Sequence, residues 1–506
     1  MSPNFSLTDL DLFGNEAAED EDDDIFNSYA LARPELDLFT SKLRKVQIAR
    51  AYKGEGKSAL LRLAANRVEA DSERPVVVRA SATELAPILS EVDFSLWVRS
   101  WKAALLGNIA AEVGATIGWA WTDDDMSLVE EAERRGFKSR NIVSAVLDRL
   151  KPAGVEFSGL KLETPAKERI GTTNPEKTIA RWATSGTPAW LFIDDVDLNF
   201  QNTPLQRVKV ASFFVACREI TNSVSRLRVR TAVRPNVWTI LKLEFESLSH
   251  VEQYTTDLRW SEDSIRSLIA LRIEAYFRRH DRWPPDSGLP SANQKTTHQD
   301  PISLVFESPM QWGKSTRPPH VLIATLSKYR PRWAIELCKV SADAANKKHH
   351  DRISRSDIFE NLDAFGRRRL EDTCAEFRSQ CEQVEELIDV FNRGNEQYKT
   401  DELLKLITNR VLEHLEPKIF GVVGRASARD VAAFLFEAGI FFGRRNLPNG
   451  EYQHISFPER PSLWKSRVDF DQGLAWEVHP VFRQALEIRD SQGREYAKLQ
   501  GRGRAR

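Results

Sequence analysis

The segment 51–58, with the sequence AYKGEGKS, contains residue types that together bind phosphate groups. It matches the pattern G-x-x-x-x-G-K-[ST] except at its first position, where Ala51 replaces glycine. The two glycines let backbone N–H groups turn toward phosphate oxygens, and the N-terminus of a following helix adds partial positive charge. We expect six consecutive residues to hold a nucleotide: Gly54, Glu55, Gly56, Lys57, Ser58 and Ala59.

Side-chain chemistry assigns two roles within this segment. Lys57 would bridge the β- and γ-phosphates of ATP, and the Ser58 hydroxyl would ligate Mg²⁺. Ala51 is tolerated if its backbone keeps a negative φ, although the missing glycine leaves affinity and rate open. The alternative is a fortuitous Gly-Lys-Ser turn, against which the neighbouring strand and helix patterns argue.

A second candidate element is the apolar run 189–193, which ends in Asp194 and Asp195. This is the Walker B pattern, and we expect it on a strand beside the phosphate loop. Asp194 would hold Mg²⁺ through water. Asp195 stands where many such ATPases carry a glutamate that polarises the attacking water, and its shorter side chain predicts slow or partner-dependent hydrolysis. The alternative is a strand that ends in a solvated pair of acids.

Three arginines could complete this chemistry. Arg234 follows the strand 226–233, where its guanidinium could sense the γ-phosphate; the alternative is a surface arginine. Arg332, in the segment YRPRWAI, could reach back over the nucleotide, since a guanidinium fits phosphate geometry. Arg218 could serve a neighbouring subunit as an arginine finger, although a surface ion pair is the favoured interpretation.

The elements that must position these residues are predicted by local patterns. Apolar and β-branched runs predict strands at 46–49, 75–78, 189–193 and 226–233. Helical spacing of apolar residues predicts helices at 58–67, 94–117, 205–221 and 261–279. A strand, helix, strand unit of this size indicates a parallel sheet with right-handed crossovers. Trp97 and Trp101, four residues apart on one helix, are expected in the core.

Together these motifs resemble the AAA+/STAND-type P-loop ATPases, with the closest likeness to bacterial members near the origin-recognition and KAP ATPases. The likeness covers about residues 43–389, with a poor match over 119–186. It implies a nucleotide-driven switch or motor that often forms oligomers. Bacterial relatives frequently occur in phage-defence and mobile-element settings, a context implied by the resemblance alone.

The sequence after the predicted core indicates further domains. We expect an acidic leader (1–40), a P-loop ATPase core (41–255), a helical lid (256–398) with an exposed loop at 282–319, a winged-helix-like domain (399–490) and a basic tail (491–506), with both ends solvated. Two helices followed by the turn signal Asn449-Gly450 suggest the winged helix. The segment 476–483 is predicted to pack as a closing helix, with His479 in the core or as a cap rather than as a ligand.

DNA is a candidate partner of the winged-helix-like domain. Four of its arginines could contact DNA phosphates: Arg425, Arg429, Arg444 and Arg445. The acids Glu437, Glu451 and Glu459 weaken this interpretation, and protein contacts or autoinhibition are the alternative use. The tail could also contact nucleic acid, although short charged ends are usually solvated.

Composition excludes several classes of protein. The chain has 506 residues, 41% hydrophobic and 29% charged, with a net charge of −1, which gives no overall drive toward nucleic acid. No apolar run approaches the ~20 residues that cross a bilayer, and the N-terminus lacks a signal-peptide pattern. Four scattered cysteines favour a reducing cytoplasm over a disulfide framework, and no CxxC pair suggests zinc.

The leading hypothesis is therefore an α/β P-loop switch that binds ATP and Mg²⁺, probes them with Asp195, Arg234 and Arg332, and controls a partner protein, further copies of itself, or DNA. The segment 214–220 and Arg332 are then positions where mutation would uncouple binding from output. The alternative is a DNA-binding regulator whose core is structural or binds nucleotide without turnover, which Ala51 and Asp195 favour.

Overall fold

The computed structural model describes residues 5–116, 128–129, 131–132, 135, 188–282, 300–313, 315–447, 452–464 and 473–489. The chain forms two compact units. The sheet unit comprises residues 32–51 and 57–258, and the C-terminal unit comprises residues 1–31, 52–56 and 259–506. The short segment 52–56 therefore makes its contacts mainly within the C-terminal unit, although the sheet unit precedes and follows it in the chain.

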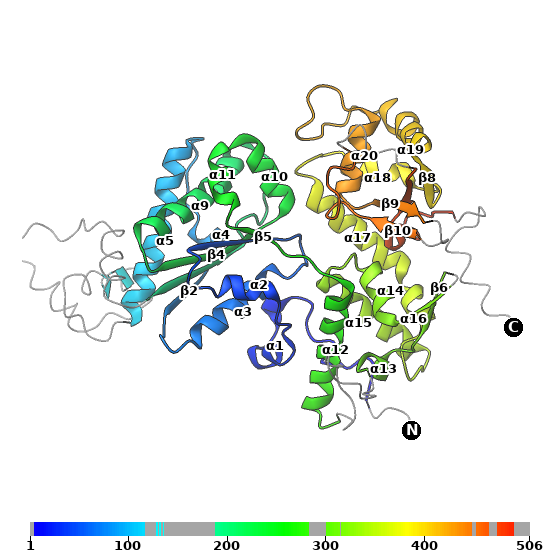
Figure 1. Cartoon of the computed structure of the whole chain (residues 1–506), viewed down its shortest axis with the longest axis horizontal. Coiled ribbons are helices and arrows are strands. Elements are labelled where there is room, and N and C mark those ends of the chain that lie inside the picture. Colours follow the sequence, from blue (N-terminus) through cyan, green and yellow to red (C-terminus); the bar gives the residue numbers. More distant parts are fainter. Residues whose placement is uncertain are drawn as a thin grey trace, which may run out of the picture. The chain divides into compact units, whose positions relative to one another are not determined.

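A five-stranded parallel sheet forms the centre of the sheet unit (Figure 1). Its strands are β1 (Val46–Arg50), β2 (Val76–Ser81), β3 (Ala189–Asp194), β4 (Leu227–Val233) and β5 (Thr255–Asp257), in the order β2-β3-β4-β1-β5. Every neighbouring pair is parallel, so the carboxyl ends of the strands meet at one edge. Strand β4 pairs with both β1 and β3, so the strand with the paired acids is separated by one strand from β1, which leads into the glycine loop.

Helices cover both faces of this sheet. They are α2 (Pro34–Phe39), α3 (Lys57–Glu69), α4 (Ala82–Leu85), α5 (Phe94–Thr116), α9 (Pro204–Ser223), α10 (Pro235–Glu244) and α11 (Ser249–Glu252). Alternate residues of a strand face opposite sides: Trp190 and Phe192 pack with α2 and α3, whereas Leu191 and Ile193 pack with α5 and α9. This two-sided burial explains why β3 is an unbroken apolar run.

The predicted helices and strands of the sheet unit are confirmed within a few residues. Trp97 and Trp101 of α5 are 2% and 1% exposed, which confirms them as core residues. The segment 140–150, whose sequence also indicates a helix, lies outside the described residues. All four cysteines of the chain are buried thiols, and no helix among the described ranges is long and apolar enough to cross a membrane.

The C-terminal unit begins with a group of helices around one large apolar core. They are α1 (Asp23–Tyr29), α12 (Glu262–Arg279), α13 (Ile302–Val305), α14 (Pro319–Leu326), α15 (Pro331–Lys347), α16 (Arg355–Glu360), α17 (Leu362–Phe377) and α18 (Val384–Ile388). The exposed loop expected at 282–319 is wrong for residues 300–318, which form α13 and the hairpin β6 (Met310–Trp312) with β7 (Ser315–Arg317). Buried Ile302, Phe306 and Met310 anchor that segment.

The acidic leader is folded where the structure describes it, although Glu21 is the one buried acid of the run 19–24 and the other five are exposed. Helix α1 packs on α12 within the same unit. Glu21 is 8% exposed and accepts hydrogen bonds from the Tyr29 hydroxyl (2.5 Å) and the Asn15 N–H (2.6 Å). The Arg272 guanidinium lies 4.2 Å from the Tyr29 ring centroid. Glu21 of the acidic run and the buried Arg272 of α12 thus both contact Tyr29.

The unit ends in a four-stranded antiparallel sheet with the order β10-β9-β11-β8. The strands of this sheet are β8 (Gln397–Lys399), β9 (Phe441–Asn446), β10 (Tyr452–Ile455) and β11 (Ala475–Val478). Two helices, α19 (Thr400–Ile407) and α20 (Ala428–Glu437), lie between β8 and β9 in the chain. The predicted hairpin is present as β9 and β10, although its turn at 449–450 lies outside the described residues. The closing helix predicted at 476–483 is wrong, because β11 pairs with β9 and β8. His479 caps a short turn by accepting the Val481 N–H (3.3 Å).

Candidate nucleotide-binding site

The glycine loop joins β1 to α3, as a phosphate-binding loop requires. Gly54 and Gly56 have φ values of +82° and +87°, a region that glycine enters without steric cost. Ala51 has no positive φ, is fully buried, and donates its N–H to the Val233 carbonyl (3.1 Å). Position 51 therefore extends β1 and has no conformational need for glycine.

Lys57 and Ser58 form the first turn of α3 and are both partly buried. The Lys57 ammonium donates a hydrogen bond to the Ala51 carbonyl (3.0 Å), which folds the side chain back along the loop. The first N–H groups of a helix have no partner within the helix, so this turn offers donors to an anion. The first turn of α3 thus combines backbone donors, a cation and a hydroxyl.

The two acids follow the apolar run at the carboxyl end of β3. Asp194 is the last residue of the strand and is partly buried, whereas Asp195 is exposed. Asp195 has a φ of +60°, and its N–H donates to Asp194 Oδ1 (2.9 Å). The strand therefore ends at Asp194, and Asp195 begins the turn that follows. Both lie at the sheet edge where β1 also ends.

Arg234 follows β4 at the same edge, and a buried acid holds it there. The Asp197 carboxylate accepts hydrogen bonds from the Arg234 N–H (2.6 Å) and Nε (3.1 Å), and the Asp197 carbonyl accepts one from its Nη2. The side chains of Asp197 and Arg234 are 6% and 18% exposed, respectively. Sequence reasoning missed Asp197; its only local signal is its place two residues after the paired acids.

Residues 53 and 54 of the glycine loop are held by α15 and α17 of their own unit. Glu376 of α17 accepts the Lys53 N–H (2.9 Å) and pairs with Arg330 (2.9 Å), which precedes α15 and donates to the Lys53 carbonyl (3.3 Å). Glu376 and Arg330 are 4% and 5% exposed. Burial opposes the charge of Arg330, but Glu376 and Glu55 outweigh it and raise the pKa of this guanidinium.

Arg332 lies directly against the loop. Its N–H donates to the Gly54 carbonyl (3.2 Å), and a Cβ placed on Gly54 would lie 3.1 Å from the Cβ of Arg332. The backbone of Arg332 therefore contacts the phosphate loop, as the prediction that this arginine lies near the loop requires. Trp260 donates its indole N–H to the Glu55 carbonyl (2.8 Å), and Glu55 accepts the Tyr52 N–H (2.6 Å), which fixes the remaining loop groups.

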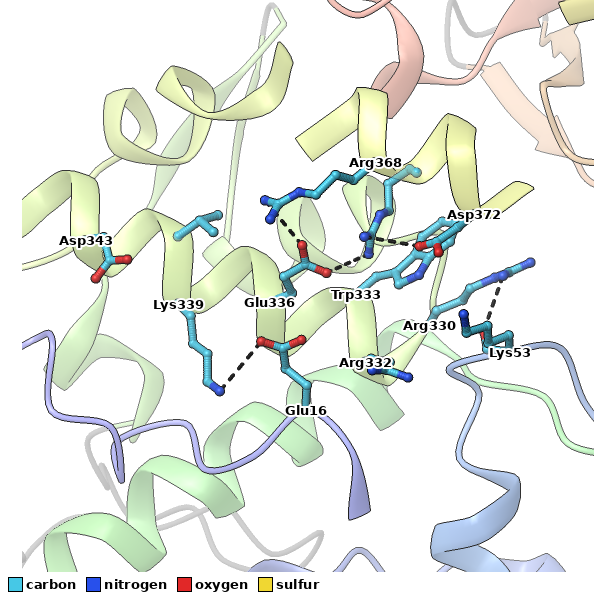
Figure 2. A pocket seen from close by; sticks show the side chains of 12 residues that line it. Glu16, Lys53, Arg330, Arg332, Trp333, Glu336, Lys339, Asp343, Arg368 and Asp372 are labelled. Atoms are coloured by element: carbon cyan, nitrogen blue, oxygen red, sulfur yellow. Dashed lines mark hydrogen bonds and ion pairs between the residues drawn. The ribbon is translucent and has the colours of Figure 1, made fainter. Parts of the chain in front are cut away.

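A cavity of about 400 Å³ opens beside Lys53 and Arg332 (Figure 2). Several charged side chains of its lining are already paired: Glu336 of α15 contacts Arg369 (2.7 Å) and Arg368 (3.3 Å) of α17, and Arg369 also contacts Asp372 (3.1 Å). The two ion pairs of Glu336 connect α15 to α17, and Figure 2 draws its pair with Arg368 as a dashed line. The cavity thus lies within the framework that positions Arg332.

The structure also describes other arginines that the sequence singled out. Arg218 of α9 is partly buried, and no ion pair joins it to any residue in the described ranges, so its role stays untested. Among the candidate DNA contacts, Arg444 pairs with Glu477 (3.2 Å) and stacks on Tyr452 (4.0 Å). Arg429 donates to the Trp464 carbonyl (2.9 Å). Both guanidiniums support the terminal sheet.

No protein-family model matches this chain, and no curated protein matches it either. Among solved structures, the chain is similar to the Aeropyrum pernix ORC2 protein in its ADPNP–ADP complexes (12% identity, TM-score 0.40, covering 88% of this chain and 89% of that one). It is also similar to the Aeropyrum pernix ORC1 protein in complex with DNA (13%, 0.36, 97% and 99%). A third is the Thermotoga maritima RuvB Holliday junction branch migration motor (13%, 0.31, 91% and 99%). All three TM-scores lie below 0.5, so these likenesses establish neither the family nor the function of this chain.

Proposed function

We propose that this protein is an ATP-binding and ATP-hydrolysing switch of the AAA+/STAND type. The observation that carries the proposal is the conformation of the glycine loop between β1 and α3, with both glycines at positive φ and Lys57 and Ser58 opening the helix. The acids Asp194 and Asp195 end β3 at the same edge of the same sheet, which is where ligands bind in parallel α/β sheets.

The residues present fit ATP and Mg²⁺. The backbone from Gly54 to Ala59 and the Lys57 ammonium would hold the phosphates, and Ser58 and Asp194 would hold the metal ion. When bound, Mg²⁺ supplies positive charge that neutralises the phosphate oxygens. The Lys57 ammonium must leave the Ala51 carbonyl to reach a phosphate, and this exchange of one acceptor for a charged one favours binding.

Asp195 and the two arginines would then divide the catalytic work. The exposed Asp195 carboxylate can accept a proton from water, the general-base role expected of it. Arg234 is oriented by Asp197, so its guanidinium keeps one position at the end of β4. Arg332 touches the loop at Gly54, which suits a group that senses whether the loop is occupied.

The switch would be read through the helices that hold the loop. Lys53, Gly54 and Glu55 have backbone groups bonded to residues of the C-terminal unit, so a change in loop conformation must rearrange those bonds. The reader of that change would be a partner effector protein or further copies of this chain in the cytoplasm. The resemblance of the motifs to bacterial defence ATPases makes phage defence the biological setting to test first.

ATP binding in the presence of Mg²⁺ tests the proposal. We expect saturable binding to the intact protein, loss of the Mg²⁺-dependent binding in Lys57→Ala, and retained binding with lost turnover in Asp195→Ala. Lys405→Ala and Asp401→Ala remove the same charges from exposed positions of α19 and serve as matched controls. Isothermal titration calorimetry gives the affinities, and phosphate release gives the turnover.

Absence of ATP binding in the intact protein would overturn the proposal. The competing function, a DNA-binding regulator with a structural core, would then be favoured by heparin retention that falls steeply with salt, because phosphate contacts release counterions. Binding without turnover in the intact protein would restrict the proposal to a nucleotide-gated switch and remove the hydrolytic role of Asp195.

A further inference from the structure

A row of arginines lies on one face of β4, at the opposite end of the strand from Arg234. Arg226, Arg228 and Arg230 are spaced two residues apart, so their side chains share a face of the sheet. Strands β2 and β3 begin beside them, at Val76 and Ala189. With ~3.3 Å of rise per residue, this edge lies about 20 Å from the edge where β3 ends in Asp194.

A cavity of about 720 Å³ opens at this edge, within the sheet unit. Four basic and two acidic side chains line it together with apolar and polar ones: Thr40, Lys42, Arg67, Val68, Asp71, Glu73, Pro75, Pro188, Trp190, Arg226 and Arg228. Its volume is in the range of small-molecule sites. The formal charge of the lining is therefore positive by two.

Arg230, the third arginine of the row, lies in the interior behind this edge and supports the chain around it. The residue is fully buried, and its guanidinium donates to the carbonyls of Phe39 (2.6 Å), Ser41 (2.8 Å) and Arg44 (2.9 Å). It also lies 4.6 Å from the ring centroid of Trp190. The segment 39–45 before β1, which contains Lys42, is thus held by one buried cation.

That cation has no carboxylate partner among the described residues. Burial, together with the charges of Arg228 and Arg44, lowers the pKa of Arg230 to about 9. An unpaired buried charge is unfavourable unless other charges balance it. The backbone carbonyls satisfy the hydrogen bonds of Arg230 but carry no full negative charge, so this residue adds positive potential to the edge where the cavity lies.

Arg228 carries that potential to the cavity itself. It is partly buried, and it donates to the carbonyls of Lys42 (2.7 Å), Ser225 (2.9 Å) and Leu227 (3.0 Å). No carboxylate in the described part of the chain pairs with it, and its Nη2 has no hydrogen-bond partner there. A guanidinium that lines a cavity with an unused donor is a ready anion ligand.

The acids of the cavity are already engaged. Asp71 and Glu73 both accept the Lys42 ammonium (3.0 and 3.2 Å), and Arg67 pairs with Asp37 (3.1 Å). These exposed pairs are weak and can exchange with a ligand. The charge that remains to be balanced therefore comes from β4, and an anion is the species that would balance it.

We propose that this cavity is a second anion site, distinct from the glycine loop, which binds a small polyphosphorylated ligand through Arg228, with Arg226 and Lys42 beside it. A concave site of this volume encloses a compact polyanion better than it follows an extended nucleic-acid backbone. The ligand class is thus a nucleoside polyphosphate or an inorganic polyphosphate. The site goes beyond the proposed ATPase activity and does not depend on it.

Calorimetric titration with inorganic triphosphate, without divalent metal, tests the site. The full-length Lys57→Ala variant removes the contribution of the glycine loop and serves as the reference. We expect Lys57→Ala to bind triphosphate, Arg228→Gln in that background to weaken binding about tenfold or more, and Arg228→Lys to retain part of the affinity. Arg226→Gln keeps the test open if the half-buried Arg228→Gln does not fold.

Arg99→Gln is the matched control, because Arg99 is exposed on α5, which covers the opposite face of the sheet. Absence of triphosphate binding in Lys57→Ala, or equal binding with and without the charges of Arg226 and Arg228, would overturn the proposal. If an oligonucleotide bound more tightly than triphosphate and with the same arginine dependence, the site would belong to nucleic acid and the small-ligand assignment would be wrong. A titration with ATP in the same variants separates a nucleoside polyphosphate from inorganic polyphosphate.

Discussion

Gly54 illustrates how single atoms decide the candidate site. Its φ of +82° excludes most side chains, and the Cβ of Arg332 lies within 3.1 Å of the position that a Cβ would take. The residue is required both by its own backbone and by the arginine that closes over it. Gly313 has a similar backbone, with a φ of +60°, but nothing lies within 4 Å of the corresponding Cβ position.

Gly54→Ala should therefore be more damaging than Gly313→Ala. Both variants incur the left-handed backbone penalty of about 1–2 kcal/mol, but only Gly54→Ala also displaces Arg332. We expect ATP affinity to fall about tenfold or more in Gly54→Ala, the equivalent of ~1.4 kcal/mol, and to stay unchanged in Gly313→Ala. Titration calorimetry measures both, and equal affinities in the two variants would contradict the role of the Arg332 contact.

The pair of Asp197 and Arg234 leads to a second prediction. Asp197→Asn keeps the shape of the side chain but leaves a partly buried guanidinium without its charge partner. We expect the unfolding free energy to fall by about 2 kcal/mol and ATP turnover to fall while ATP binding is retained. Chemical denaturation and phosphate release measure the two effects. Unchanged turnover would show that the orientation of Arg234 has no part in the reaction.

Lys328 leads to a prediction about pH. Its side chain is partly buried and its ammonium donates to the Ala438 carbonyl (3.0 Å), and desolvation, with Arg330 nearby, lowers its pKa to about 7. Between pH 7 and the unfolded pKa near 10.4, the unfolded chain binds more protons, so this group makes stability rise with pH. The slope has a ceiling on the order of 1 kcal/mol per pH unit, and below pH 7 the contribution is constant.

Lys328→Met removes that titration. We expect the difference in unfolding free energy between wild type and Lys328→Met to shift in favour of the wild type as pH rises from 7 to 9. Thermal or urea unfolding at several pH values measures the difference. A constant difference over this range would show that the lysine remains charged in the folded protein.

At the scale of elements, spacing alone predicted the helices and strands whose buried residues follow a local period. Helix α5 is an example, because its buried residues recur at helical spacing, and strand β3 was predicted equally well from its unbroken apolar run. Strand β11 is the opposite case. Its four residues have no strong local pattern, and its pairing with β9 and β8 makes it a strand.

Trp476 tests that strand. It is fully buried in β11, lies 4.5 Å from the Trp464 ring centroid, and donates its indole N–H to the Thr400 hydroxyl (3.0 Å). We expect Trp476→Ala to lower the unfolding free energy of the C-terminal unit by about 3–5 kcal/mol, and Trp476→Phe to cost clearly less. Denaturant unfolding followed by circular dichroism gives both values, and a small loss in Trp476→Ala would contradict this packing.

At the scale of the whole molecule, the two units have separate apolar cores. One large cluster belongs to the C-terminal unit. The sheet unit has two clusters, one on each face of the parallel sheet. Separate cores allow separate cooperative unfolding. Lys57, Ser58 and Asp194 all lie in the sheet unit.

We therefore expect two calorimetric transitions, of which ATP with Mg²⁺ raises the one that belongs to the sheet unit. At a ligand concentration 100 times the dissociation constant, the bound ligand stabilises the folded unit by about 2.7 kcal/mol. Each kcal/mol of stabilisation raises the midpoint temperature of the transition by roughly 2–4 °C. Lys57→Ala should abolish the part of the shift that requires Mg²⁺, and Trp476→Phe should identify the other transition by lowering it. A Mg²⁺-dependent shift that persists in Lys57→Ala would place the nucleotide elsewhere.

The sequence by itself determined the glycine loop, the paired acids, and most elements of the sheet unit. Each of these depends on neighbouring residues: glycine at positive φ, helix formation after Lys57, and an apolar run ending in Asp194. Their local periods and residue types carry the information.

Only the tertiary structure decided which distant groups meet. The place of β4 between β1 and β3, the Glu376 bond to Lys53 across 323 residues, and the Asp197 bond to Arg234 all join segments that carry no mutual pattern in the chain. The same holds for the positive charge of Arg228 and Arg230. Whether a carboxylate lies near these arginines depends on how the chain folds, and none pairs with them among the described residues. Chain folding brings these groups together through the burial of the cores around them, so no local spacing could predict them.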